Sequence, residues 1–149
     1  MYREHCYPRD KNIVDYGPEP FVVNIDCATK RNSTFRTALW TGTHLQLTLM
    51  CIKVGGEVGL EKHPSLDQFL RIEDGMGLVK MGNSSDKLYY QKTVCSGYAI
   101  FVPAGTWHNL INTGNRPIKL YSIYAPPAHP HGTVHETKAI AEVEEGQHS

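Results

Sequence analysis

From residue 21 onwards, the chain alternates short runs rich in β-branched and aromatic residues with clusters of Gly, Asn, Asp and Ser. This punctuation is typical of an all-β sandwich or barrel, because turn residues end each strand after a few positions. Residues 44–49 alternate polar and apolar side chains, so one face of that strand meets a core. The expected strands cover residues 21–26, 35–40, 44–54, 58–63, 69–73, 78–81, 88–94, 98–102, 107–112 and 118–125.

The chain has 149 residues, with 15 Lys and Arg balanced by 15 Asp and Glu. This length suits one domain, residues 1–149. Zero net charge argues against nucleic acid and anionic membranes as partners. No apolar stretch reaches the roughly 18 residues of a transmembrane helix, and residues 1–10 do not resemble an export signal. The four cysteines are scattered without a metal-binding spacing, which favours a reduced, cytoplasmic protein.

The two ends differ from the strand-rich part. Residues 1–20 contain three prolines and little apolar pattern, so we expect an N-terminal arm without regular structure. Residues 126–149 form a polar tail, in which Thr133 and Glu136 have capping-box spacing. This spacing predicts a short helix reaching residue 145 that docks through a narrow apolar stripe of Ile140 and Val143.

A first candidate site lies in the glycine-framed segment of residues 55–75. Side chains i and i+2 share a face of an extended strand, so Glu61 and His63 point the same way. Residues 64–67 make a natural turn, after which Gln68 opens the next strand opposite His63. Cross-strand neighbours lie about 5 Å apart at Cβ, so Glu61, His63 and Gln68 are expected to converge on one point.

A second segment supplies a fourth donor. A Pro-x-Gly turn at residues 103–105 ends an apolar strand and delivers His108 at the start of the next one. With the three residues above, His108 completes a set of two nitrogens and two oxygens, which suits Mn, Fe, Ni, Co or Zn better than Mg or Ca. Without Gln68 the set is a facial triad of two His and one carboxylate, the pattern of O2-activating ferrous sites. One divalent transition metal is the expected cofactor.

These segments resemble the two motifs of the cupins, a family of small antiparallel β-barrels also described as jelly rolls or double-stranded β-helices. The first motif, G-x5-H-x-H-x4-E-x6-G, is matched in spacing from Gly55 to Gly75. The second motif, G-x5-P-x-G-x2-H-x3-N, is matched at every fixed position, by Gly97, Pro103, Gly105, His108 and Asn112. The resemblance places the motif-bearing barrel core at residues 45–125. The chain is similar to small bacterial single-domain cupins of the mannose-6-phosphate isomerase-like type.

The first motif departs from the family pattern in its chemistry. Glu61 stands where the motif has its first His, and Gln68 stands where it has Glu. Two roles stay open for Glu61: a metal ligand, or a general base just outside a three-ligand site with positions left for substrate. Gln68 is either a ligand or a residue that orients a histidine.

The resemblance implies a metalloenzyme that acts on a small oxygenated substrate, such as a sugar phosphate or a keto acid, by an isomerase-like proton transfer. Two other classes use the same residues. One is an Fe(II)-dependent dioxygenase with the facial triad, and the other is a non-catalytic module that binds a metal or a small molecule. We also expect a homodimer.

Other polar residues receive structural interpretations. Asn112 is expected to tie down a turn. By the parity of its strand, Arg71 faces away from the metal, so a solvated or interface arginine is expected there. The tail histidines are interpreted as mobile surface rather than as a second metal site. They are His129, His131 and His135.

Overall fold

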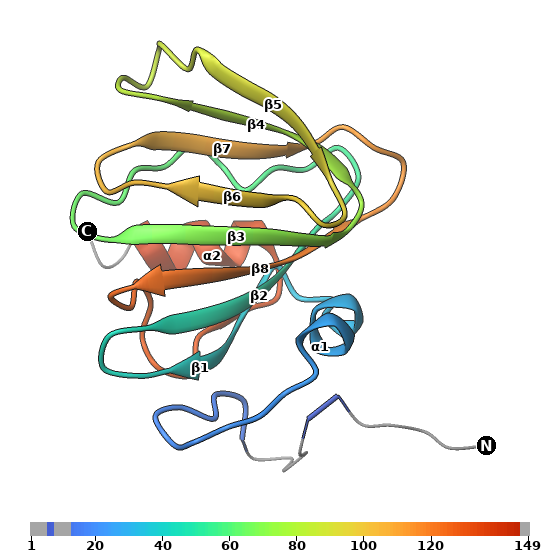
Figure 1. Ribbon diagram of the computed structural model, residues 1–149, viewed down its shortest axis with the longest axis vertical. Coiled ribbons are helices and arrows are strands. Elements are labelled where there is room, and N and C mark those ends of the chain that lie inside the picture. The colour runs from blue at the N-terminus through green and yellow to red at the C-terminus, as the bar shows by residue number, and fades with distance from the viewer. Residues whose placement is uncertain (1–5, 8–12, 147–149) are drawn as a thin grey trace.

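The computed structural model describes residues 6–7 and 13–146. In this part of the chain, nine strands form two antiparallel sheets (Figure 1). The larger sheet has the strand order β6-β3-β8-β2-β1-β9, and the smaller sheet has the order β5-β4-β7. The expected all-β fold with a short C-terminal helix is confirmed. The elements are α1 (Ile25–Arg31), β1 (Arg36–Thr41), β2 (Gln46–Ile52), β3 (Asp67–Asp74), β4 (Met76–Gly82), β5 (Tyr90–Cys95), β6 (Ala99–Val102), β7 (Trp107–Asn112), β8 (Ile118–Ala125), β9 (Val134–His135) and α2 (Lys138–Gly146).

The inward-facing side chains of the larger sheet form two layers. β2 pairs with β8 so that Met50 lies opposite Leu120 and Thr48 opposite Ser122. Alternate residues of a strand share a face, so every second side chain points into the interior. Along each strand these inward side chains are polar toward one end of the barrel and apolar toward the other. The apolar half contains Met50, Ile52, Leu70, Ile72, Ile118 and Leu120, and the polar half contains Gln46, Thr48, Gln68, Ser122 and Tyr124, all of them buried.

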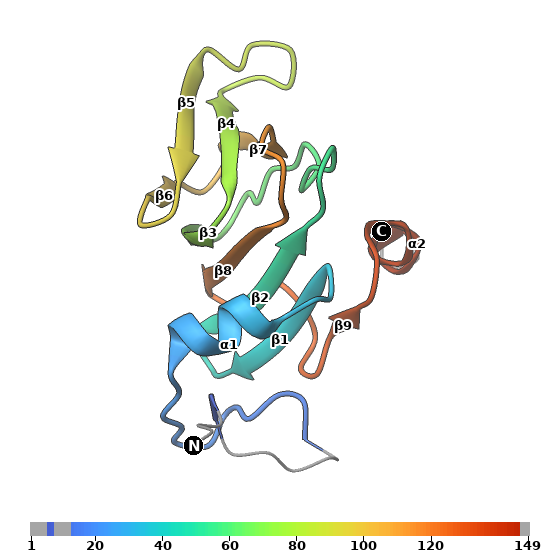
Figure 2. The same cartoon turned by 90° about the vertical axis from the view of Figure 1, so that its right-hand side faces the viewer.

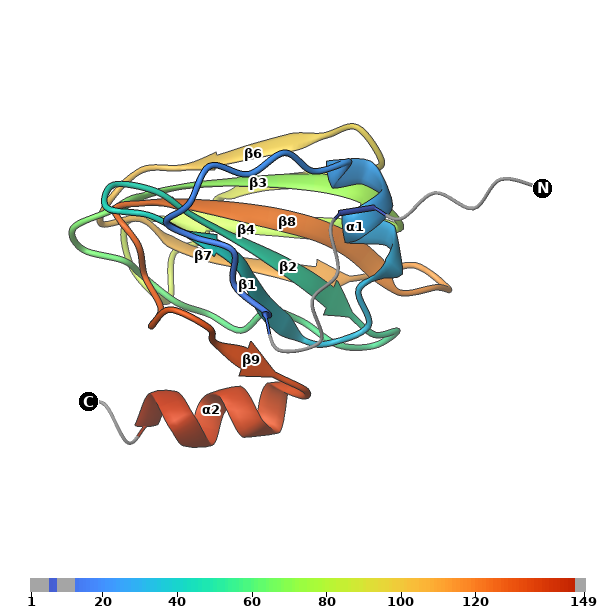
Figure 3. The ribbon, with the colours of Figure 1, turned by 90° about the horizontal axis from the view of Figure 1, so that it is seen from below.

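Eight of the ten expected runs coincide with strands, with ends that differ by a few residues. The run at residues 21–26 is wrong, because Asn24 caps α1: its Oδ1 accepts a hydrogen bond from the N–H of Cys27 at 3.1 Å. Asp26 in the first turn and Lys30 in the last turn also favour the helix. α1 packs on the outer face of the larger sheet, on the opposite side from α2 (Figures 2 and 3).

The expected strand at residues 58–63 is not regular. This segment follows β7 through separate bridges, one of which joins Glu61 to His108. Gly59 lies before that bridge with a φ of 107°. A residue in that conformation interrupts a ladder, and glycine adopts it without strain. The segment is therefore a loop held along the edge of the smaller sheet.

The N-terminal arm is docked where the structure describes it. The buried Asp15 carboxylate accepts hydrogen bonds from the backbone N–H groups of Gly17, Thr41 and Gly132, and from the hydroxyl of Thr41. Thr41 ends β1 and Gly132 precedes β9, so one side chain joins the arm, the barrel and the tail. Residues 1–5 and 8–12 of the expected arm lie outside the described residues.

The polar tail packs on the barrel. β9 pairs with β1, placing His135 beside Arg36. The side chain of His135 is buried and that of His129 is nearly so, which makes the interpretation as mobile surface histidines wrong for these two. His131 is half exposed, and its Nε2 lies 2.7 Å from the carbonyl oxygen of Gly17. The sequence does not reveal this packing because the partners lie about a hundred positions away.

α2 begins later than the capping-box spacing predicts, and it docks through a different face. The hydroxyl of Thr137 accepts a hydrogen bond from the N–H of Ile140, so the helix begins at Lys138. Ala141 enters the hydrophobic core, whereas Ile140 and Val143 are exposed. The expected apolar stripe is therefore wrong. The remaining contacts of α2 with the barrel include ion pairs, which a search for apolar stripes misses.

The expectation of four reduced cysteines is wrong. Cys6 and Cys27 form a disulfide with a Cα–Cα distance of 5.3 Å, while Cys51 and Cys95 are free. The cytoplasmic location loses the support of the cysteine argument and stays a prediction. Among the helices in the described ranges, none is long and apolar enough to cross a membrane.

Asn112 ties down the turn after β7, as expected. Its Nδ2 donates to the carbonyl oxygens of Ile52 and Arg116, and its Oδ1 accepts from the N–H of Gly114. Asn112→Ala leaves these groups unpaired and should lower the free energy of unfolding in urea by about 2–4 kcal/mol. Asn115→Ala, at an exposed site in the same turn, should change it by less than about 0.5 kcal/mol. Equal losses in the two variants would contradict this role.

Candidate metal centre

His108 lies near the start of β7 and is buried. Its Nδ1 is 3.0 Å from the carbonyl oxygen of Thr106. A carbonyl oxygen can only accept a hydrogen bond, so Nδ1 carries the proton and Nε2 presents a lone pair. This is the tautomer that a metal-ligating histidine needs, with its second nitrogen held by the backbone.

Backbone hydrogen bonds fix the loop that carries the other two residues. Glu61 and His108 exchange both backbone hydrogen bonds, at 3.0 and 2.9 Å. Residues paired in this way lie directly opposite each other, which brings their side chains to the same side of the ladder. The N–H of Gly105 donates to the carbonyl oxygen of His63 at 2.8 Å. The Pro-x-Gly turn before β7 therefore holds the His63 loop directly.

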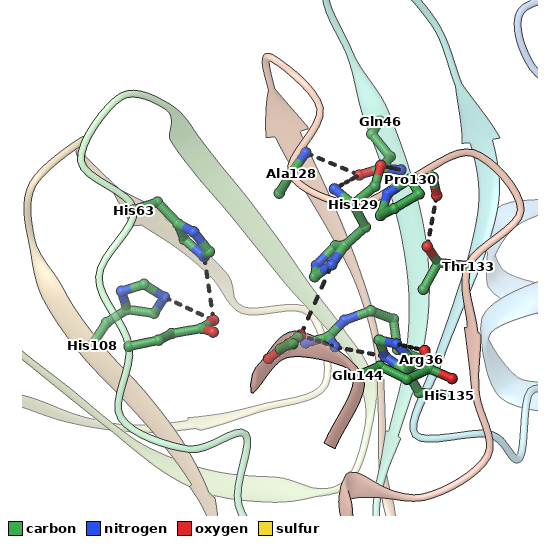
Figure 4. Close-up of polar contacts among 12 residues, drawn as sticks. Arg36, Gln46, His63, His108, Ala128, His129, Pro130, Thr133, His135 and Glu144 are labelled. Carbon is green, nitrogen blue, oxygen red and sulfur yellow. Dashed lines mark hydrogen bonds and ion pairs between the residues drawn. The ribbon is translucent and has the colours of Figure 1, made fainter. Parts of the chain in front are cut away.

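Three donor atoms meet at the polar half of the barrel. Oε1 of Glu61 lies 3.4 Å from Nε2 of His63 and 3.4 Å from Nε2 of His108. The ligand atoms of the three residues all lie within 4.8 Å of one another. Figure 4 shows the rings of His63 and His108 side by side, with their centroids 5.5 Å apart. The structure thus brings together three of the four predicted ligands, and we call Glu61, His63 and His108 the candidate metal centre.

The spacing of these atoms fits a transition metal. Bonds of about 2.0–2.2 Å at tetrahedral or octahedral angles separate two ligand atoms by roughly 3.0–3.5 Å. The Nε2 atoms of His63 and His108 are buried, and neither makes a hydrogen bond to any described residue. A buried polar atom without a partner costs about 1–3 kcal/mol. A cation bound between the two rings and the Glu61 carboxylate would satisfy both nitrogens.

Gln68 reaches the same region by a different route from the one expected. β3 pairs with β6 and β8, so the expected hairpin that sets Gln68 opposite His63 is wrong. Gln68 instead pairs with Tyr124, whose ring centroid is 5.7 Å from that of His63. Its Nε2 donates to Ser122, while its Oε1 is buried without a partner in the described chain. That free oxygen is the atom that a metal ligand would use.

The carboxyl group of Glu61 is held in its anionic form. Burial alone raises its pKa, but the contacts with His108 and His63 outweigh burial and hold the pKa well below its usual range. An anionic carboxylate beside two histidine nitrogens is the form that can bind a cation, which agrees with the ligand role of Glu61.

Sequence reasoning misses a second polar cluster, which we call the Arg36 cluster: Arg36, His129, His135, Glu144 and Glu145. The buried guanidinium of Arg36 places Nη1 3.1 Å from Nδ1 of His135 and 3.0 Å from Oε1 of Glu145. Nε2 of His135 is 2.9 Å from Glu144, and the ring of His129 lies beside that of His135 (Figure 4). The sequence only weakly indicates this cluster. Predicting it requires knowing both that Arg36 points into the barrel and that the tail pairs with β1.

The two antiparallel sheets with a His and Glu cluster at one end define a barrel with a possible metal site. A cupin domain matches residues 48–124, and the chain belongs to the cupin family.

The relatives of the chain extend this match over most of its length. The chain is 67% identical over 134 residues to the Bacillus subtilis protein YrkC, covering 89% of this chain and 72% of that protein. A crystal structure of a Bacillus halodurans protein is similar with a TM-score of 0.87 and 68% identity, over 88% of this chain and 99% of that one. A Thermus thermophilus protein at 21% identity shares the fold, with a TM-score of 0.55 over 61% of this chain and 81% of that one.

The burial of His129 makes the stability of the fold depend on pH. Burial first, and then the charge of Arg36, lowers the pKa of His129 to about 3, against 6.5 for an ordinary histidine. Between these values the unfolded chain binds a proton that the folded chain does not, so the free energy of unfolding falls as the pH is lowered. His129→Gln should reduce this slope by up to about 1.4 kcal/mol per pH unit, measured by urea unfolding. Above roughly pH 7.5 the two profiles should run parallel. If the free energy of unfolding fell equally steeply with pH in both chains between pH 3 and 6.5, folding would not lower the pKa of His129, and the prediction would be wrong.

Proposed function

We propose that this cupin is a metal-dependent enzyme with one divalent transition metal, which is Mn, Fe, Ni, Co or Zn. Glu61, His63 and His108 would hold the metal, with Gln68 as a fourth ligand. The observation that carries the proposal is the single Glu61 oxygen lying 3.4 Å from two buried histidine nitrogens that have no other described partner. Two nitrogens with carboxylate and amide oxygens suit these metals.

The proposed substrate is a small oxygenated molecule, such as a sugar phosphate or a keto acid, in an isomerase-like proton transfer. The bound metal would supply Lewis-acid polarisation of a substrate carbonyl. The polar half of the barrel would orient the substrate beside it. Tyr124 would line this part of the site, because its ring packs against that of His63.

The metal site is tested by elemental analysis of natively purified variants. His63→Ala and His108→Ala should each lose most of the bound metal, because each removes one of only three or four proposed ligands. His44→Ala, at an exposed histidine outside the motifs, should keep the metal content of the parent chain. Circular dichroism checks that each variant is folded. Stoichiometric metal in both folded ligand variants would overturn the proposed centre.

A separate variant decides between the two roles of Glu61. Glu61→Gln keeps the shape of the side chain but removes its charge. If Glu61 is a ligand, as we propose, metal affinity should fall at least about tenfold, measured by competition with a chelator. Metal affinity equal to that of the parent chain, with turnover abolished, would instead assign Glu61 as the general base.

A second candidate function follows from the identity of the three ligands. Two His and one carboxylate form the facial triad used by Fe(II)-dependent dioxygenases. Substrate-dependent O2 uptake that a chelator abolishes would favour this class over the isomerase-like one. Binding of small molecules without turnover in any metal-loaded form would favour a non-catalytic binding module.

We also propose that the chain forms a homodimer. The support is a group of exposed aromatic side chains on and beside the edge strands β5 and β6: Tyr90, Tyr98 and Phe101. Phe101→Asp should shift the mass measured by light scattering from dimer to monomer, because it places a charge in an apolar contact. Val22→Asp, at another exposed apolar position, should leave the mass unchanged. A monomeric parent chain would contradict the proposal.

A further inference from the structure

The Arg36 cluster contains a buried positive charge with an incomplete set of partners. The side chain of Arg36 is only 3% exposed. Its Nη1 contacts His135 and Glu145, while its Nε has no hydrogen-bond partner in the described chain. A buried guanidinium loses its hydration and is stabilised only by an anion and by saturated hydrogen bonds. Arg36 contacts the Glu145 carboxylate, but its Nε–H group makes no hydrogen bond to a described residue.

Arg36 is the positively charged group of the cluster, because the neighbouring imidazoles are neutral. Arg36 can only donate hydrogen bonds, so Nδ1 of His135 must accept, and the proton of that ring lies on Nε2, facing Glu144. His135 is therefore neutral in this arrangement. His129 is nearly buried, and its Nε2 also has no described partner. Apart from the carboxylates of Glu144 and Glu145, the cluster thus contains one positive charge beside a neutral ring whose Nε2 has no described partner.

The Arg36 cluster and the candidate metal centre both contact the buried side chain of Tyr124. The ring of Tyr124 lies 5.7 Å from that of His63 on one side and 5.2 Å from that of His129 on the other. The ring of Tyr124 therefore contacts a histidine ring of each group. Both groups contain buried polar atoms without a partner in the described chain. They are Nε2 of His63 and Nε2 of His108 in the metal centre, and Nε2 of His129 and Nε of Arg36 in the Arg36 cluster; Gln68, which pairs with Tyr124, adds its Oε1. Atoms of this kind mark where a ligand or water would bind.

The anion now on Arg36 comes from the last turn of α2. Oε1 of Glu145 is 3.0 Å from Nη1 of Arg36 and 3.9 Å from Nδ1 of His129. The Glu145 side chain is 46% exposed. It can therefore turn into solvent by a rotation about its own bonds, without displacing α2. The carboxylate of Glu145 occupies the position that the carboxylate of a ligand would take.

We propose that Arg36, with His129 beside it, binds the carboxylate of a small organic acid whose other oxygen atoms reach the metal centre, and that Glu145 holds this position in the absence of the acid. The inference rests on the proposed function for the metal end of the substrate only. It narrows the substrate class from oxygenated molecules in general to carboxylic acids.

A carboxylate fits this subsite better than a phosphate. The planar fork of a guanidinium matches the two oxygens of a carboxylate, and a carboxylate already lies on Arg36. A phosphate monoester carries up to about two negative charges near neutral pH. One guanidinium beside neutral imidazoles leaves the second of these charges uncompensated. A sugar phosphate is therefore the competing substrate class that the test must include.

The test is isothermal titration calorimetry on the full chain, both metal-loaded and chelator-treated. The probes are pyruvate, lactate and oxaloacetate, with methyl pyruvate and methyl lactate as neutral counterparts and dihydroxyacetone phosphate as the phosphate. We expect at least one acid to bind the metal-loaded chain, its ester to bind at least about tenfold more weakly, and the phosphate to bind more weakly than the acid. No binding by any acid, or equal binding by acid and ester, would overturn the proposal.

Two variants locate the carboxylate on Arg36. Arg36→Met keeps a long side chain but removes the charge, and it should weaken acid binding at least about tenfold. Glu145→Gln removes the competing carboxylate and should tighten acid binding by about tenfold. Glu142→Gln is the matched control on an exposed face of α2, where Glu142 pairs with Lys138, and it should leave the affinity unchanged.

The outcomes separate this proposal from the metal proposal. Arg36→Met and Glu145→Gln should keep the metal content of the parent chain, since neither residue belongs to the metal centre. If Arg36→Met fails to fold, Glu145→Gln still decides, because unchanged affinity in that variant would overturn the subsite. A chain that binds no metal but shows the Glu145→Gln effect would retain the carboxylate subsite and lose the metal proposal. The reverse result would retain the metal and reject the subsite.

Discussion

The pair of backbone hydrogen bonds between Glu61 and His108 is the interaction on which the candidate metal centre depends. It joins a loop without regular structure to the edge of β7, and it sets two ligand-bearing residues directly opposite each other. The ring of His108 is oriented by the Thr106 carbonyl, and the backbone of His63 is held by Gly105. The positions of the three donor atoms thus follow from main-chain contacts, which do not depend on whether a metal is bound.

The layering of the barrel interior explains why polar chemistry is confined to one end. Strands β2 and β8 change from apolar to polar inward residues at the same level, because their register aligns Met50 with Leu120 and Thr48 with Ser122. β3 changes one pair further along, where Gln68 lies opposite Tyr124. The apolar half supplies the burial that stabilises the fold. The polar half contains groups that are fully buried yet incompletely paired, an arrangement that costs stability and is typical of a binding site.

The parts of this molecule that the sequence predicts are those encoded by local pattern. Strand runs and the spacing around His63 and His108 follow from side-chain alternation and from turn residues with specific backbone preferences. Asn24 is a favourable N-cap and indicates the helix that follows it, but the apolar run before it favours a strand instead. The route of Gln68 to the site depends on the pairing of β3 with β8, and the Arg36 cluster depends on the return of the tail. Both are contacts between distant segments, which no local pattern contains.

The four hydrogen bonds accepted by Asp15 bear on how the molecule opens. Its carboxylate joins the N-terminal arm to Thr41 and to Gly132, which lies 117 positions further along the chain. Detaching the tail would leave a buried carboxylate short of donors, so we expect the arm and the tail to come away from the barrel together. The segment that carries His129 and His135 is thereby anchored from the opposite end of the sequence. Local unfolding of the arm would loosen the Arg36 cluster before it reached the strands that carry the metal ligands.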